Sequence, residues 1–169
     1  MSLPDPHRLA DDTARAQAQA MIAAARHAVL AVLDESGWPM TSRIALQTDA
    51  GSVPLALLSG LALHTTALTR DPRASLLIDD TTAPRGSALT RARLSVQVRA
   101  ERLTDPAETD GLRALWRARD PKAAVYLGLP DFRFWRLKPQ GGLLNAGFGR
   151  AFRLTAADLL PANERGPAE

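Results

Sequence analysis

The stretch SGLALHTTALTRDPRASLLIDD, residues 59–80, predicts a short helix followed directly by a strand. Its first half gathers hydrogen-bond donors at the start of an apolar, helix-like run, namely Ser59, His64, Thr65 and Thr66. Asp71 and Pro72 end this run, and residues 74–78 then predict a strand. Hydroxyls and an imidazole at the start of a helix are typical either of helix capping or of an anion-binding site.

Upstream of this stretch, the sequence predicts one helix and a three-stranded meander. Asp5 and Pro6 match an N-cap and a proline at the first helical position, and apolar residues then recur at helical spacing from Leu9 to Ala24. Residues 27–33 and 40–47 predict two strands joined by a turn, and residues 53–59 predict a third strand. We therefore expect residues 1–26 to form a helix that packs on a domain spanning residues 27–158.

Downstream of it, residues 93–100 show the clearest alternation of apolar and polar side chains in the chain. Asp105 and Pro106 predict the start of a helix, and Asp120 and Pro121 predict the start of a shorter one. The remaining segments predict a polar loop at 81–88, strands at 132–137 and 143–154 joined by a turn at 138–142, and a flexible tail at 159–169. Six or seven mostly antiparallel strands with peripheral helices indicate an α+β barrel.

The composition is that of one folded, soluble domain. Of the 169 residues, 46% are hydrophobic and 23% are charged, and no apolar run approaches the roughly 20 residues that span a bilayer. The chain has no cysteine, and its first residues lack the basic and apolar regions of an export signal. We expect a cytoplasmic protein without disulfides.

The basic character of the chain does not by itself indicate a nucleic-acid partner. The 21 lysines and arginines are spread along the sequence and face 18 acidic residues, which leaves a net charge of +3. A nucleic-acid-binding surface is expected to cluster basic residues among exposed aromatics, yet aromatic residues make up only 5% of the chain. A barrel that binds single-stranded nucleic acid therefore stays a second, less favoured alternative.

Arg43 and the start of the helix after Ser59 form the sharpest candidate site. Free N–H groups and the helix dipole favour an anion at a helix start, and Arg43, on a neighbouring strand, matches a phosphate with its guanidinium fork. The alternative is structural: His64 or Thr65 only caps the helix, and Arg43 is one surface arginine among many.

Other chemistry-bearing patterns are weak. Asp79 and Asp80 are adjacent, so in a strand their carboxylates face opposite sides and cannot share a metal ion or a proton. The sequence contains no cysteine nucleophile, no GxSxG motif and no Walker motif. No side chain is evident as a catalytic acid or base, and we predict no metal site.

Several segments, in order along the chain, resemble the FMN-binding split barrels of the pyridoxamine 5'-phosphate oxidase-like superfamily. They are GWPMTSRIAL (37–46), the SxLAxHTxxL pattern (59–68), DPRASLLI (71–78), ARLSV (92–96) and FRFWRLKPQGGLLNAGFGRAF (132–152). The combination of SxLAxHT with GFGRA is similar to the branch of HugZ-type heme-utilisation proteins. The resemblance implies a six- to seven-stranded split β-barrel with peripheral helices.

The resemblance also implies a homodimer with two flavin sites at the subunit interface. Carried over by position, Ser42 and Arg43 are strand donors to the flavin phosphate, and Ser59, His64 and Thr65 are donors at the helix start. Arg93 is expected near the edge of the flavin ring. Two further residues have open alternatives. Trp135 stacks on the ring or lies in the core or dimer interface, and Arg150 reaches the flavin or pairs with an acid.

The sequence departs from the pattern of its relatives at three places. The chain has GFGRAFRL where the oxidases carry a basic segment for the substrate phosphate, so pyridoxamine phosphate is not the expected substrate. Val98 replaces a common glycine, and Ala67 replaces a common asparagine. We expect an FMN-dependent oxidoreductase with a small-molecule redox substrate. The alternative is a non-catalytic protein of heme or iron utilisation, although His7, His27 and His64 show no paired spacing.

Overall fold

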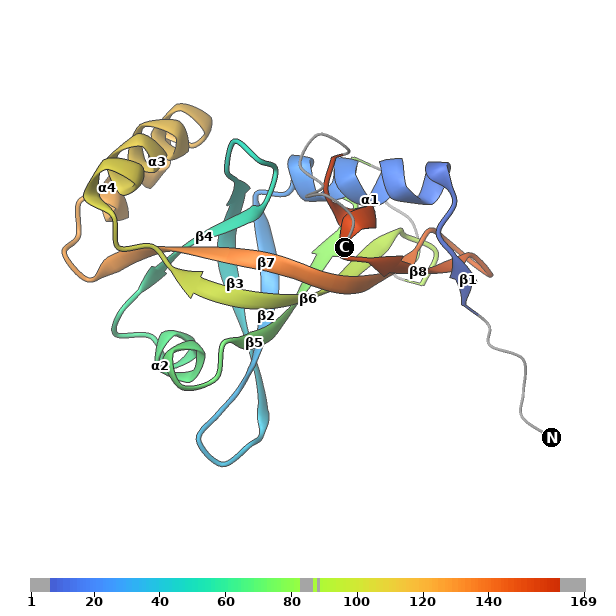
Figure 1. Ribbon diagram of the computed structural model, residues 1–169, viewed down its shortest axis with the longest axis horizontal. Helices are drawn as coiled ribbons and strands as arrows, with labels where there is room; N and C mark the ends of the chain where they lie inside the picture. Colours follow the sequence, from blue (N-terminus) through green and yellow to red (C-terminus); the bar gives the residue numbers. More distant parts are fainter. Residues whose placement is uncertain (1–6, 83–86, 88, 162–169) are drawn as a thin grey trace.

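Six antiparallel strands close into a barrel in the order β7-β4-β3-β2-β5-β6, and β6 pairs with β7 to complete the ring (Figure 1). The computed structural model describes residues 7–82, 87 and 89–161. The barrel strands are β2 (His27–Leu33), β3 (Pro39–Thr48), β4 (Pro54–Ser59), β5 (Arg73–Asp79), β6 (Arg93–Arg102) and β7 (Phe132–Asn145). The predicted α+β, mostly antiparallel split barrel is therefore confirmed.

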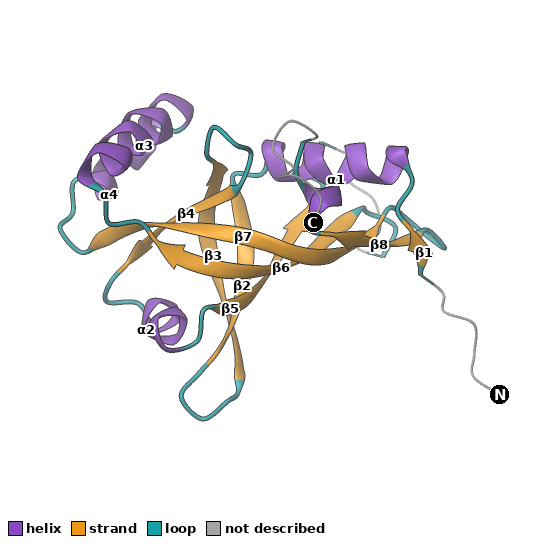
Figure 2. Cartoon of the chain, viewed as in Figure 1, coloured by secondary structure: helices purple, strands orange, loops and turns teal. Residues whose placement is uncertain are grey.

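The N-terminal helix begins later than the sequence predicted. Leu9 belongs to β1 (Arg8–Leu9), which runs parallel to β8 (Ala151–Thr155) and extends the sheet beyond β7 (Figure 2). The helix α1 (Asp12–Ala24) starts after Asp11, whose carboxylate accepts a hydrogen bond of 2.7 Å from the N–H of Ala14. Leu9 is extended because its backbone pairs with β8, and the expected cap at residues 5 and 6 lies outside the described residues.

The other helices lie around the barrel. In Figure 1, α1 lies above it and α2 (Leu63–Arg70) below it, while α3 (Pro106–Arg119) and α4 (Ala124–Leu127) lie together beside one end. The short 3-10 turn η1 (Pro121–Ala123) connects α3 to α4. A second one, η2 (Ala157–Leu159), follows β8. As predicted, Asp105 and Asp120 cap the helical segments that follow them.

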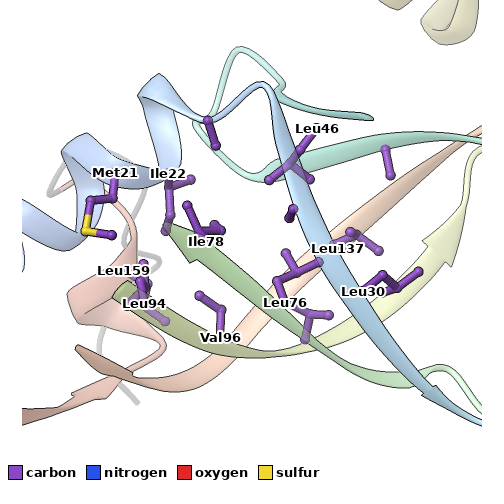
Figure 3. Packing of buried hydrophobic residues seen from close by; sticks show 14 of the residues in the cluster. Met21, Ile22, Leu30, Leu46, Leu76, Ile78, Leu94, Val96, Leu137 and Leu159 are labelled. Atoms are coloured by element: carbon purple, nitrogen blue, oxygen red, sulfur yellow. The ribbon is translucent and has the colours of Figure 1, made fainter. Parts of the chain in front are cut away.

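Inward-facing residues of the strands fill the barrel, and the apolar face of α1 extends this core (Figure 3). Leu30, Leu46, Leu76, Val96 and Leu137 are each at most 1% exposed. Burying each such side chain contributes about 1.5–3 kcal/mol. Leu159 of η2 is also buried in it, so the expected flexible tail cannot begin there.

A second, smaller core lies outside the barrel, between β4 and β7 and the helices α3 and α4. Leu55 and Leu57 point to this side, whereas Ala56 and Leu58 point into the barrel. Strand β4 is apolar along its length because it is buried on both faces. The rings of Trp116 and Phe134 meet edge to face, with centroids 5.8 Å apart.

Strand β7 passes straight through residues 138–142, where the sequence predicted a turn. The glycines in this segment allow the backbones of neighbouring strands to approach β7 closely. A Cβ added to Gly142 would lie 2.7 Å from the carbonyl oxygen of Ser95 on β6. Pro139 is accommodated at a shift of register between β6 and β7, where the regular ladder of hydrogen bonds is interrupted. The real turn lies at residues 146–150, where Gly147 and Gly149 adopt φ angles of +116° and +70°.

None of the described helices is long and apolar enough to cross a membrane.

Candidate functional site

Strands β3 and β4 pair over a short ladder and then diverge, and the opening between the diverging strands organises the candidate site. Only three pairs of residues link the two strands, from Thr48 and Pro54 to Leu46 and Ala56. If the ladder continued, Arg43 would stand opposite Ser59, the last residue of β4. Beyond the three pairs, β3 continues beside β2 and β4 continues beside β7. The helix α2 follows β4 and packs against β2 and β3.

The turn from β4 into α2 is built around the Ser59 side chain. Its hydroxyl donates a hydrogen bond of 2.5 Å to the Asp131 carboxylate and accepts one of 3.1 Å from the N–H of Leu61. The Thr65 hydroxyl donates to the Ser59 carbonyl over 2.7 Å, and the N–H of Gly60 donates to the Asp131 carbonyl over 2.8 Å. The hydroxyls of Ser59 and Thr65, predicted as phosphate donors, are therefore engaged within the protein.

The first turn of α2 keeps donors of its own. The N-cap position is Ala62, which has no side chain to cap the helix. Thr65 and Thr66 direct their N–H groups to the Ala62 carbonyl, whereas those of Leu63 and His64 have no acceptor among the described residues. Two free N–H groups at the positive end of a helix suit an anion. The anion-binding capacity here comes from the backbone more than from the predicted hydroxyls.

His64 is half-buried in this turn, and burial lowers its pKa below the ordinary 6.5. The imidazole is therefore mostly neutral at neutral pH and offers a hydrogen bond rather than a full positive charge. A permanent charge is available from Arg43, which is exposed on β3.

Arg43 and Arg93 share one surface, the outer face of the sheet formed by β3, β2, β5, β6 and β7. Residues that pair across antiparallel strands lie on the same face. One such row crosses this face and consists of Arg43, Val29, Leu77, Ser95 and Leu143. His27 and Arg93 stand two residues further along β2 and β6, on the same face. Asp79 pairs with Arg93 across β5 and β6, so the outer face combines an apolar centre with cationic, imidazole and acidic side chains around it.

A groove of about 560 Å³ adjoins this row on the outer face. It is lined by residues of β2, β5, β6 and β7, among them Ala31, Ser75, Gln97, Arg99 and Gln140. Leu77 is 38% exposed beside it. This face is therefore suited to be covered by a ligand or another protein surface.

Three other predicted site residues are placed elsewhere. Ser42 pairs with the buried Leu30, so it faces the barrel interior and points away from Arg43. Trp135 is 4% exposed and belongs to the barrel core, which is the second of the two positions expected for it. Arg150 is exposed in the turn between β7 and β8, where its backbone closes the turn with Ala146 and Gly147.

A second hollow, of about 480 Å³, lies between β3 and the end of α3. Its lining includes Arg26, Gln47, Arg119 and Lys122. Gln47 is 3% exposed and donates to the Trp116 carbonyl, but its Oε1 atom has no donor among the described residues. Sequence reasoning missed this hollow, because its lining residues are far apart in the chain. It also missed Asp131, which belongs to no local motif and is far from Ser59 in the sequence.

Residues 14–145 match the family model described as pyridoxamine 5'-phosphate oxidase. The chain belongs to this family. The match covers all six barrel strands in full and most of α1, so it agrees with the fold of the described residues.

Relatives place the chain near heme-related members of the family. It is 30% identical over 116 residues to the non-canonical heme oxygenase HOZ of Arabidopsis thaliana, which is 69% of this chain and 34% of that protein. A solved heme-binding protein from Mycobacterium smegmatis is 26% identical, with a TM-score of 0.77 over 94% of this chain and 61% of that one. The protein Atu2129 of Agrobacterium tumefaciens is 33% identical, with a TM-score of 0.79 over 95% and 64%.

The chain therefore spans about a third of the curated relative and just under two thirds of the two solved ones. The predicted resemblance to the heme-utilisation branch is confirmed, since two of these three relatives are described by their relation to heme.

Proposed function

We propose that this chain binds flavin mononucleotide as an oxidoreductase, with the phosphate at the start of α2 and the ring on the outer face of the sheet. The observation that carries the proposal is the uncapped start of α2, where Leu63 and His64 have N–H groups without an acceptor in the described part of the chain. Arg43 stands at the edge of the same opening and supplies the charge that a phosphate needs.

The outer face supports the second half of the proposal. Its apolar row of Val29, Leu77 and Leu143 suits a planar aromatic ring, and Arg93 stands beside it for a polar ring edge. An apolar face of this kind is also suited to isologous packing in a homodimer, which would cover the exposed Leu77. A subunit interface that passes over the ring would exclude water from it.

A bound flavin would supply the electron or hydride transfer, and the protein would supply binding, orientation and electrostatics. The proposed redox substrate is a small molecule that exchanges electrons with the flavin directly. Pyridoxamine phosphate is not proposed, because the sequence lacks the basic segment that the oxidases use for its phosphate. As part of the same proposal, the protein acts in the cytoplasm.

Heme is the second candidate, and the two heme-related relatives favour it. The same outer face is apolar and cationic, which also suits a macrocycle with carboxylate groups. His27 is exposed on this face and is the side chain there that can ligate iron. In this alternative the protein stores or transfers heme without using a flavin.

Absorption spectroscopy separates the two candidates. The purified protein is incubated with FMN or with hemin, excess ligand is removed, and the visible spectrum is recorded before and after dithionite. Retained flavin that dithionite bleaches supports the oxidoreductase. A heme band with no retained flavin overturns it in favour of heme binding, and a matched His27→Ala variant then tests whether His27 ligates the iron.

A further inference from the structure

Asp131 contacts the turn from β4 into α2 at two points, although no local sequence motif connects it to that turn. Its Oδ2 atom accepts a hydrogen bond of 2.5 Å from the Ser59 hydroxyl. Its backbone carbonyl accepts one of 2.8 Å from the N–H of Gly60. The two partners are separated by about seventy residues, so this contact fixes β4 and the segment before β7 together at the entrance to α2.

The side-chain contact determines how the Ser59 hydroxyl is oriented. A serine hydroxyl has one proton to donate, and here Asp131 receives it. A lone pair of the Ser59 oxygen then accepts the N–H of Leu61, while the Ser59 carbonyl accepts the Thr65 hydroxyl. Through Ser59, Asp131 therefore orients both ends of the segment that carries the free N–H groups of Leu63 and His64.

We infer that Asp131 is a positioning residue that aims these N–H groups at the ligand phosphate. The inference rests on the proposed function. It assigns Ser59 a different role from the one expected from sequence: Ser59 transmits the position set by Asp131 and does not give its proton to the phosphate.

The charge of Asp131 acts in the opposite direction from its hydrogen bond. A carboxylate beside an anion site repels the phosphate, whereas its oxygen is needed to hold Ser59. An asparagine keeps an acceptor oxygen and removes the charge, and an alanine removes both. The two substitutions therefore separate positioning from electrostatics.

The test compares FMN with riboflavin, which lacks the phosphate, in titrations monitored by flavin fluorescence. We expect Asp131→Ala to weaken FMN binding about five- to tenfold, since a hydrogen bond of this kind contributes on the order of 1 kcal/mol. Riboflavin affinity is expected to change less than about twofold. Asp131→Asn is expected to bind FMN as well as the wild type or better.

Asp158→Ala is the matched control. Asp158 also accepts hydrogen bonds from a hydroxyl and a backbone N–H, those of Thr155, but it lies beside α1. We expect this variant to lose stability without changing the ratio of FMN to riboflavin affinity. An Asp131→Ala protein with an unchanged ratio would overturn the inference, and so would a Ser59→Ala protein that loses FMN affinity while Asp131→Ala does not.

Amide hydrogen exchange tests the positioning without any flavin. In Asp131→Ala, the N–H of Leu61 is expected to exchange faster, because its acceptor is no longer held in place. In Asp158→Ala it is expected to exchange as in the wild type. If the wild type binds neither flavin but these exchange rates differ as expected, the proposed function fails while the fixed turn stands. If the rates are equal, the positioning role fails whatever the ligand.

Discussion

The guanidinium of Arg136 lies 2.7 Å from the carboxylate of Asp49 and joins β7 to the turn between β3 and β4. A second 2.7 Å contact connects Arg136 to Glu108 on α3. The side chains of Arg136 and Asp49 are 20% and 10% exposed. This ion pair therefore holds the closed end of the β3–β4 ladder, from which the two strands diverge toward the candidate site.

Arg136→Ala is expected to destabilise the protein by about 2–4 kcal/mol, because it leaves the largely buried Asp49 carboxylate without its counterion. Urea unfolding followed by circular dichroism measures the loss. Arg73→Ala is the control, since Arg73 pairs with Asp71 but its side chain is 73% exposed, and we expect a clearly smaller loss there. Equal losses in the two variants would show that the Arg136 pair adds nothing beyond a surface contact.

Gly142→Ala is expected to destabilise the barrel by about 1–3 kcal/mol, since the new Cβ would lie 2.7 Å from the backbone oxygen of Ser95. Gly111→Ala is the matched control. Gly111 lies inside α3 with nothing within 4 Å of an added Cβ, so alanine there is expected to stabilise the protein by about 0.5–1 kcal/mol. Thermal unfolding of both variants checks these opposite signs, and a neutral Gly142→Ala would contradict the close approach of β6 and β7.

The strands and helices with strong local signals were predictable. The alternation in β6, the proline-marked start of α3 and the apolar run of β2 each follow from periodicity or capping. The turn predicted at residues 138–142 was wrong, because glycine and proline also occur where strands approach closely, and only the neighbouring Ser95 shows which case applies. The start of α1 was misplaced because a pairing with β8, far away in the sequence, holds Leu9 in a strand.

The candidate site was predictable at the level of segments but not of atoms. Sequence placed Arg43 and the start of α2 on neighbouring elements. It could not show that Asp131, from a distant loop, engages the Ser59 hydroxyl and leaves the backbone of Leu63 and His64 as donors. It also left Trp135 open between ligand and core, and only its burial in the barrel decides for the core.

FMN affinity is expected to rise as the pH falls below about 7. In the free protein, burial lowers the pKa of His64 below 6.5, so the imidazole is neutral near neutral pH. A bound phosphate favours the protonated form and raises this pKa, so binding takes up a proton. The FMN affinity continues to rise until the pH reaches the pKa that His64 has in the free protein. Each unit by which the His64 pKa of the bound protein exceeds that of the free protein corresponds to about a tenfold gain in FMN affinity.

Titrations between about pH 5.5 and 8 check this dependence. His64→Gln removes the imidazole proton and reports the titration of FMN itself, and His64→Lys keeps a positive charge and is expected to bind more tightly than the wild type at the alkaline end. The same pH profile in wild type and His64→Gln would place His64 away from the phosphate.

The most direct measurement of the proposed phosphate site is an FMN titration of Arg43→Ala beside the wild type. Arg117→Ala serves as the control, since it removes an exposed arginine of α3 and leaves Arg43 in place. We predict that Arg43→Ala stays folded, loses about ten- to a hundredfold in FMN affinity and keeps its riboflavin affinity, whereas Arg117→Ala binds both as the wild type does. Unchanged FMN affinity in Arg43→Ala would contradict the phosphate site at the opening between β3 and β4.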